Sequence, residues 1–265
     1  MHTKEEKLKA FGDFLDVLDT LREKCPWDRK QTNESLRPNT VEEVYELCDA
    51  LIASDTPNIC KELGDVLLHV AFYAKIGEEK GDFDFADVCE KLTKKLIFRH
   101  PHIYGDVKAD DADTVLQNWE QIKLKEKDGN KTVLSGVPSA LPALIKANRI
   151  QEKARNVGFD WDRPEDVWAK VKEEIAEVEA EICRDGEEID KKRAEAEFGD
   201  LLFSVINAAR LYGVDPENAL ERTNRKFISR FNHIEKRLKE SGRGFKDADL
   251  EEMDRYWEEA KRLSK

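Results

Sequence analysis

The sequence has no long hydrophobic run and few cysteines, and both absences limit where the protein works. No apolar stretch approaches the roughly 20 residues that cross a bilayer, and the opening residues MHTKEEKLKA carry no apolar signal core. We therefore expect a cytoplasmic protein with no membrane partner. The five cysteines lack zinc spacing and are interpreted as reduced packing residues: Cys25, Cys48, Cys60, Cys89 and Cys183.

Excess positive charge is also absent. The chain carries 45 Lys and Arg residues against 57 Asp and Glu residues, a formal net charge of -12. This balance argues against a protein that collects nucleic acid by charge, so no nucleic-acid partner is expected. Hydrophobic residues make up 40% of the 265, which is enough for one or two compact cores. The Glu-x-x-His motif of di-iron carboxylate bundles does not occur.

Helical periodicity dominates the chain and strand alternation is not evident, so we predict an all-α fold. Cys25–Asn39 is predicted to be a loop, after which Thr40 caps a helix and Glu43 completes a possible capping box. The other expected helices span residues 4–24, 57–81, 85–98, 112–127, 143–156, 164 to before Gly186, 216–240 and those after Asp249.

The second half of the chain repeats the first half in order. The offset between matched residues stays between 131 (Glu42 to Glu173) and 138 (Trp119 to Trp257). Differences therefore lie in loops, and we predict a repeat over 1–130, a linker over 131–142 and a second repeat over 143–265. The matched blocks include Trp27-Asp28-Arg29 with Trp161-Asp162-Arg163, Glu42-Glu43-x-x-Glu46 with Glu173-Glu174-x-x-Glu177, and Glu62-Leu63-Gly64-Asp65 with Glu197-Phe198-Gly199-Asp200.

Each copy carries two carboxylate pairs at helical spacing on successive helices. An antiparallel helix pair would bring the four carboxylates together, where they repel unless a cation neutralises them. Oxygen ligands suit Mg²⁺, with Mn²⁺ as a substitute. A solvated acidic helix face is the alternative for each pair. The four residues are Glu43, Glu46, Glu62 and Asp65 in the first copy, and Glu174, Glu177, Glu197 and Asp200 in the second.

The surroundings of the second carboxylate set favour a polyphosphate ligand. Lys226 and Arg230 share one helix face and recur in the first copy as Lys95 and Arg99. Cations facing a metal suit a chain of phosphates, and surface ion pairing is the alternative. Trp161 and Trp257 are candidates for stacking on a base or for core packing. The apolar positions next to the carboxylates are expected to face inward: Phe198, Leu201, Leu202 and Val205.

The two copies differ in basic residues. Lys170 lies one turn before Glu174, and Asn39 occupies the matching position in the first copy. Arg193 likewise lies one turn before Glu197 and is matched by Asn58. The second copy can oppose more phosphate charge, so we predict that it is the catalytic one. The first copy is then a weaker, differently selective or structural site.

The motifs resemble those of the MazG family of tandem-domain nucleoside triphosphate pyrophosphohydrolases. Beyond the two carboxylate sets, the resemblance rests on Cys25-Pro26-Trp27-Asp28, Arg99-His100-Pro101-His102, Leu141-Pro142-Ala143-Leu144 and Gly158-Phe159-Asp160-Trp161. It covers essentially the whole chain. It implies an all-α homodimer of interleaved helices, and Mg²⁺-dependent hydrolysis of ribo- and deoxynucleoside triphosphates. A metal-activated water would attack the α-phosphorus, giving the monophosphate and pyrophosphate.

The resemblance also assigns roles in the second copy. Glu174, Glu177, Glu197 and Asp200 would hold the metal, and Glu173 would orient the water, with a solvent-facing side chain as its alternative. Two other readings stay open: a narrower dUTP, dCTP or phosphoribosyl-ATP pyrophosphohydrolase, and a non-catalytic helical oligomerisation module. We predict catalytic roles for Glu173, Glu174, Glu177, Lys226 and Arg230, and substrate binding by Phe159, Trp161, Lys170, Arg193, Lys226, Arg230 and Trp257.

Overall fold

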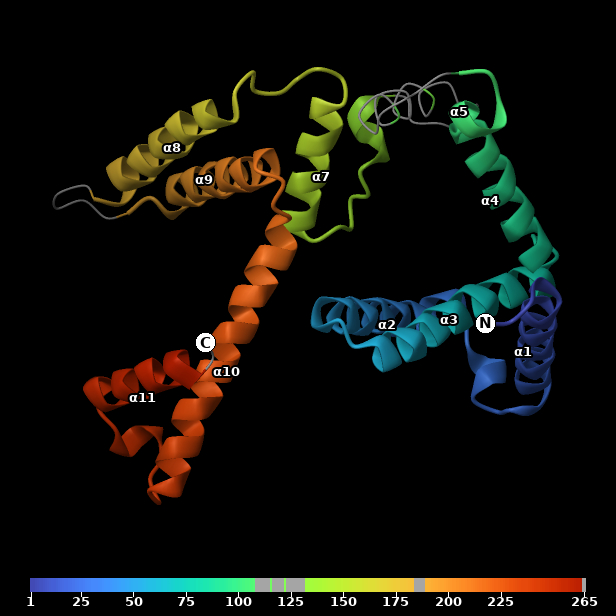
Figure 1. Cartoon of the computed structure of the whole chain (residues 1–265), viewed down its shortest axis with the longest axis horizontal. Coiled ribbons are helices and arrows are strands. Elements are labelled where there is room, and N and C mark those ends of the chain that lie inside the picture. Colours follow the sequence, from blue (N-terminus) through green and yellow to red (C-terminus); the bar gives the residue numbers. More distant parts are fainter. Residues whose placement is uncertain (108–114, 116–121, 123–131, 184–188, 264–265) are drawn as a thin grey trace. The chain divides into compact units, whose positions relative to one another are not determined.

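Helices form the whole regular structure of the described chain, as the sequence predicts. The computed structural model describes residues 1–107, 115, 122, 132–183 and 189–263. Among these residues there is no strand (Figure 1). None of their helices is long and apolar enough to cross a membrane. The chain divides into two units, Met1–Lys108 (unit 1) and Ala109–Lys265 (unit 2).

Unit 1 begins with α1, whose start is fixed by a reciprocal capping box. The Thr3 hydroxyl accepts from the Glu6 N–H, and the Glu6 carboxylate accepts from the Thr3 N–H at 2.7 Å. α2 and α3 form a helical hairpin, because only Ser54 and Asp55 separate them. The helices of unit 1 are α1 (Lys4–Lys24), α2 (Asn33–Ala53), α3 (Thr56–Lys80), α4 (Phe85–Arg99) and α5 (Pro101–Tyr104), with a 3₁₀ turn at Asp28–Lys30.

The predicted loop before Thr40 is wrong, because α2 starts at Asn33 and contains Pro38. Thr32 is the true cap: its hydroxyl accepts from the Ser35 N–H at 3.2 Å, and the Ser35 hydroxyl accepts from the Thr32 N–H at 2.9 Å. Pro38, the sixth residue of α2, removes one helical N–H, yet the helix continues through it to Ala53. Thr40 lies inside the helix, and the capping-box alternative for Glu43 is therefore excluded.

Unit 2 repeats this hairpin as α8 and α9, which pack around Val167, Val171 and Ala208. Asp190 caps α9, and Asp215 caps α10 through the Asn218 N–H at 2.7 Å. The elements of unit 2 are α7 (Ala143–Arg155), α8 (Val167–Ile182), α9 (Lys191–Leu211), α10 (Pro216–Glu240) and α11 (Leu250–Leu263), with 3₁₀ turns at Val133–Gly136, Pro164–Asp166 and Phe245–Asp247.

Most predicted helices agree with these bounds within a few residues. The helix expected over 112–127 and the Gly186 boundary lie outside the described residues. The linker over 131–142 stays a prediction. Its described part, from Thr132, carries the 3₁₀ turn at Val133–Gly136 and is tied to α7 by Lys146, whose ammonium donates to the Ser139 carbonyl at 2.6 Å.

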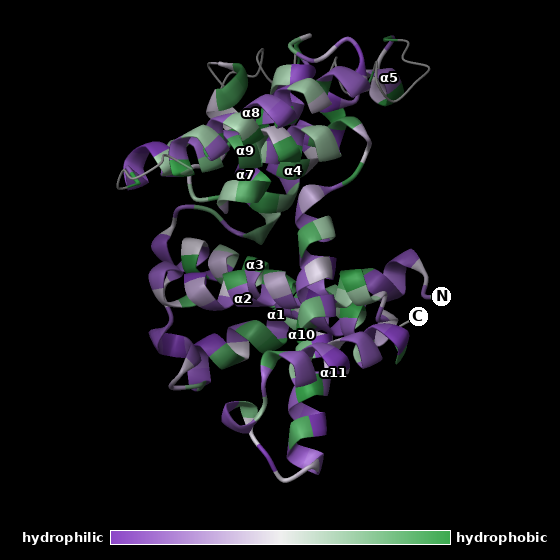
Figure 2. Ribbon diagram, turned by 90° about the vertical axis from the view of Figure 1, so that its left-hand side faces the viewer, coloured by the Kyte–Doolittle hydropathy of each residue, from purple (hydrophilic) through white to green (hydrophobic). Residues whose placement is uncertain are grey.

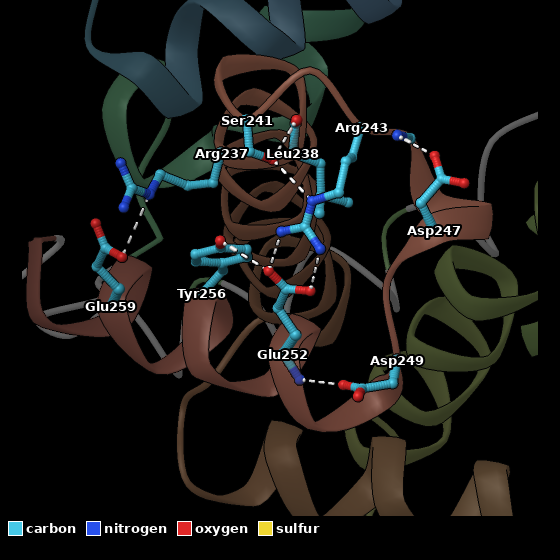
Figure 3. A network of polar contacts seen from close by, with 10 residues as sticks. Arg237, Leu238, Ser241, Arg243, Asp247, Asp249, Glu252, Tyr256 and Glu259 are labelled. Atoms are coloured by element: carbon cyan, nitrogen blue, oxygen red, sulfur yellow. Dashed lines mark hydrogen bonds and ion pairs between the residues drawn. The ribbon is translucent and has the colours of Figure 1, made fainter.

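A polar network folds α11 back against α10 (Figure 3). Arg243, just after α10, makes a two-pronged ion pair with Glu252 of α11. The Tyr256 hydroxyl donates to the same carboxylate at 3.0 Å, and Asp249 caps α11 by accepting from the Glu252 N–H at 2.8 Å. These contacts fix the α11 face that carries Trp257. We call α10 and α11 together the C-terminal arm.

Two predictions about packing are wrong. The cysteines are not packing residues, because four of the five are exposed and only Cys25 is partly covered. Three of the four apolar positions predicted to face inward on α9 do not: Phe198, Leu202 and Val205 are 45%, 62% and 45% exposed. Leu201, the fourth, packs against the core of the hairpin as predicted. The face of α9 that meets α8 uses other positions, among them Ala208. Figure 2 shows such apolar residues interleaved with polar ones on the hairpin helices and along α10.

Candidate metal centre

The α8–α9 hairpin brings three of the four predicted carboxylates of unit 2 together. Glu174, Glu197 and Asp200 each offer an oxygen within 4.8 Å of the other two; we call them the C-terminal trio. Glu174 is only 4% exposed, and its Oε2 atom has no hydrogen-bond partner among the described residues. A buried carboxylate oxygen without a donor is costly. The donor set and this oxygen therefore fit a hard divalent cation.

The hairpin of unit 1 builds an equivalent cluster from Glu43, Glu62 and Asp65, the N-terminal trio, with the same 4.8 Å limit. Here the buried member is Glu62, 5% exposed, whose Oε2 atom also lacks a partner among the described residues. The orphaned oxygen thus sits on the second helix of this hairpin, whereas in unit 2 it sits on the first. Burial raises the pKa of Glu43, helped by the neighbouring Asp65 carboxylate.

The fourth predicted carboxylate of each set, Glu46 or Glu177, lies outside its trio. Glu177 nevertheless belongs to the same electrostatic cluster. Its pKa is raised, first because it shares a hydrogen bond with Glu174, and further because of burial and the nearby Glu197 charge. Carboxylates that crowd this closely favour bound protons or a bound cation.

We expect this crowding to appear in the pH dependence of stability. Since folding raises the pKa of Glu177, the unfolding free energy of metal-free protein falls as the pH rises from the ordinary carboxyl value of 4.5 through the raised pKa. Glu177→Gln removes this loss. In urea unfolding with EDTA, the variant should gain stability over wild type at about pH 7 but not at about pH 4. An equal difference at both pH values would contradict the assignment.

A lysine contacts each cluster. In unit 2, the Lys170 ammonium lies 2.8 Å from Glu173 and 2.5 Å from Glu174, and the Glu173 and Glu174 carboxylates raise its pKa. Glu173 is therefore engaged by Lys170 rather than simply solvated. In unit 1, Lys61 lies 2.8 Å from Glu62, and that hydrogen bond is the main cause of its raised pKa. The sequence analysis predicted no role for Lys61.

A cavity of about 400 Å³ lies beside α9 and begins one helical turn beyond Asp200 of the C-terminal trio. Asp200, Phe203, Asn207 and Arg210 recur at i, i+3, i+7 and i+10 on α9, so they share one helix face. The last three line the cavity, which is mainly apolar and within the size range of small-molecule sites. The other lining residues are Leu134, Ile150, Gln151, Ala154, Phe159, Asp160 and Trp161.

Four polar side chains are fixed in the cavity wall. Arg210 donates to Asp160 at 3.0 Å and to the Asn207 side-chain oxygen at 2.8 Å. Gln151 is 6% exposed, and its amide nitrogen donates to the Phe203 carbonyl at 2.8 Å. Its Oε1 atom has no partner among the described residues, so it can accept a hydrogen bond from a ligand in the cavity.

The matching region of unit 1 is filled. At the offset of 135 that relates Glu62 to Glu197, Asn207 corresponds to Phe72 and Phe203 to Leu68. Phe72 is 3% exposed and packs in the core with Leu18 and Leu36. The Asn207 side chain, which lines the cavity in unit 2, is therefore replaced in unit 1 by the Phe72 ring, which occupies the corresponding space.

Of the predicted phosphate-binding cations, Lys226 and Arg230 are not brought to the trio within one chain. Lys226 lies ten residues into α10 and Asp200 eleven residues before the end of α9, about 15 Å along each helix axis from their junction. α10 leaves that junction and runs away from the α8–α9 hairpin (Figure 1). On the C-terminal arm, Arg230 stacks over the Trp257 ring at 5.5 Å. Arg193 pairs with Asp190 of the same helix start, at 3.6 Å.

Sequence analysis missed Lys61, Gln151, Asn207 and the Asp160–Arg210 pair. A signal for two of them was available. Asn207 and Arg210 are polar positions on the helix face of Asp200, in a segment otherwise made of small and apolar residues. For Gln151 the sequence offers no such signal, because its role depends on the Phe203 carbonyl, which is distant in sequence.

The fold and the trios define an all-α protein of two repeats, each built around an acidic helix hairpin. The chain matches the MazG nucleotide pyrophosphohydrolase domain twice, over residues 31–104 and 163–235, which together are more than half of its length. The two matches contain the N-terminal and C-terminal trios, respectively. The chain therefore belongs to the MazG nucleotide pyrophosphohydrolase family.

Similar bacterial proteins support this membership. The chain is 43% identical over 254 residues to the nucleoside triphosphate pyrophosphohydrolase/pyrophosphatase MazG of Thermotoga maritima, covering 95% of each protein. It is 41% identical to a nucleoside triphosphate pyrophosphohydrolase of Escherichia coli K12, over 94% of this chain and 96% of that protein. It also matches the uncharacterized protein YabN of Bacillus subtilis at 46% identity, over 97% of this chain but 53% of YabN.

Proposed function

We propose that unit 2 hydrolyses nucleoside triphosphates, ribo and deoxy, to the monophosphate and pyrophosphate, with Mg²⁺ as cofactor and Mn²⁺ as a substitute. The observation that carries the proposal is the arrangement on α9. The C-terminal trio, which has Glu197 and Asp200 on α9 and Glu174 on α8, is followed by an apolar cavity one turn beyond Asp200 on the same face of α9. Such a site can hold the phosphates and the nucleoside of one substrate at the same time.

Different residues would bind the triphosphate end and the nucleoside end of the substrate. The trio would hold a divalent ion, which lowers the pKa of water and offsets phosphate charge. Lys170, one turn before Glu174, places an ammonium beside the trio for the phosphate oxygens. Glu173 accepts a hydrogen bond from Lys170 at 2.8 Å, and its carboxylate would orient the attacking water. The water oxygen would bond to the α-phosphorus and lose its proton to solvent as the bond to the α,β-bridging oxygen breaks, so that pyrophosphate leaves.

The cavity would receive the nucleoside. Phe159 and Trp161 contribute aromatic surface for a base, and both are largely open to solvent in this structure. The free Gln151 acceptor can take a base N–H, and the Asp160–Arg210 pair holds the wall in place. Because Phe72 fills the corresponding space in unit 1, we assign turnover to unit 2 and a supporting role to unit 1.

The test is pyrophosphate release from a panel of ribo- and deoxynucleoside triphosphates in Mg²⁺, Mn²⁺ or EDTA. We expect release from several of them, dependent on the ion. Activity confined to dUTP, dCTP or phosphoribosyl-ATP would establish the narrower pyrophosphohydrolase instead. No release from any substrate, together with no stabilisation by Mg²⁺, would establish the non-catalytic module.

We further propose a homodimer, because both units leave the same apolar stripe uncovered. Leu63, Leu67 and Val70 on α3 match Phe198, Leu202 and Val205 on α9 at an offset of 135, and every one is at least 38% exposed. A side-chain carbon added at Gly64 or Gly199, also equivalent, meets nothing within 4 Å. Two helices of a second copy could approach closely there and bury the stripe. The second copy could also supply Lys226 and Arg230 to the trio.

Leu202→Asp should convert this dimer to monomer. Leu202 is 62% exposed within one chain, so the charge is tolerated by the chain itself but not by an apolar interface. Light scattering after size exclusion should report half the wild-type mass, with the circular dichroism unchanged. Lys191→Asp, at an exposed polar position of the same helix, is the control and should stay dimeric. A monomeric wild type would overturn the proposal.

A further inference from the structure

The N-terminal trio already contains a cation of its own. The Lys61 ammonium lies 2.8 Å from Glu62, 3.5 Å from Asp65 and 4.0 Å from Glu46. Two of these carboxylates belong to the trio. The amine therefore sits against two of the carboxylates that would coordinate a metal, and one of them is the buried Glu62, whose Oε2 atom is unpartnered among the described residues.

The C-terminal trio is arranged differently. Ala196 occupies the position that matches Lys61, immediately before Glu197. Lys170 reaches Glu174, but its other partner is Glu173, which is not part of the trio. Within the described chain, no Lys or Arg pairs with Glu197 or Asp200. In unit 2, two of the three trio carboxylates therefore have no lysine or arginine partner within the described chain. In unit 1, two of the three carboxylates pair with Lys61.

We propose that Lys61 is an internal competitor for the divalent ion at the N-terminal trio, so that unit 2 loads its metal before unit 1. The inference rests on the metal sites of the proposed function, but it concerns the unit to which we assign no turnover. A divalent ion entering unit 1 must displace the ammonium from Glu62 and Asp65 or share their charge with it. Like charges at this distance repel, which weakens binding.

The competition is reversible rather than a permanent block. The Lys61 side chain is 61% exposed, so it can swing into solvent when an ion binds. Its ion pairs near the surface are individually weak. Glu62 keeps its free Oε2 atom with Lys61 in place, so the site stays open to an ion. We therefore expect a weakened N-terminal site, not a missing one.

The experiment is a Mn²⁺ titration of the full-length protein, with free Mn²⁺ measured by electron paramagnetic resonance. In a Glu174→Gln background, which disables the C-terminal trio, Lys61→Ala should tighten Mn²⁺ binding about tenfold, as expected for removing one charge near 4 Å in largely aqueous surroundings. Lys94→Ala removes the same charge from an exposed ion pair on α4 and should leave binding within about twofold. No tightening with Lys61→Ala would overturn the proposal.

A reciprocal variant makes the test independent of the Glu174→Gln background. Ala196→Lys, in the otherwise wild-type chain, should weaken the tighter class of Mn²⁺ sites and narrow the gap between the two classes. An unchanged tight class would contradict the inference. Pyrophosphate release is measured on the wild-type protein, because Glu174→Gln is itself expected to abolish it. If wild type hydrolyses no substrate but Lys61→Ala still tightens Mn²⁺ binding in the Glu174→Gln background, the proposed function fails and the competitor role is retained.

Discussion

Replacing Glu174 by Gln should reduce pyrophosphate release by about a thousandfold, which corresponds to about 4 kcal/mol of transition-state stabilisation. Glu174 is the buried member of the C-terminal trio, and its Oε2 atom has no partner among the described residues. An amide has the same shape but carries no charge and offers only one acceptor. Both the affinity for the ion and its correct placement should therefore be lost.

The matched control is Glu43→Gln, the same change at the repeat-equivalent position of unit 1. It should leave the rate within about twofold, because the cavity region beside it is filled by Phe72. Mn²⁺ titration of both variants separates loss of the ion from loss of folding. Wild-type rates in Glu174→Gln would refute the assignment of the trio. Equal losses in both variants would show that unit 1 also takes part in turnover.

The repeat made the fold and the carboxylate clusters predictable, since chance acidic spacing cannot reproduce matched blocks in order. Periodicity alone was a weaker guide to packing. Phe198, Leu202 and Val205 form an apolar stripe by sequence, yet the chain leaves them exposed, because a helical period shows which residues share a face and not what covers that face. The loop predicted over Cys25–Asn39 was wrong in its second part, because a proline can be accommodated inside a helix, as Pro38 is at the sixth residue of α2.

The placement of the cations was less predictable still. Lys226 and Arg230 share a helix face, as their spacing indicates, but the direction in which α10 leaves α9 is set by the junction between them. Lys61 lies directly before Glu62, where a helical neighbour would normally point elsewhere. Its long side chain bends back onto the cluster, and only the structure reveals this.

The difference between the units can be tested by copying it from one to the other. Asn207→Phe places in unit 2 the residue that unit 1 carries as Phe72. The ring should fill the cavity of about 400 Å³ beside α9 and exclude the base. We expect kcat/KM to fall about a hundredfold, since a base kept out of an apolar cavity forfeits about 3 kcal/mol of burial. Mn²⁺ binding to the trio should be unchanged.

Asn207→Ala is the control that separates filling the cavity from losing the amide. Both variants remove the acceptor that Asn207 offers Arg210, and both leave Arg210 its bond to Asp160. Only the phenylalanine occupies the space. A large loss in Asn207→Phe with a small one in Asn207→Ala would locate the nucleoside in the cavity. Similar losses would mean that the amide itself matters, and wild-type rates in both would place the nucleoside elsewhere, leaving the metal trio as the sole part of the site on α9.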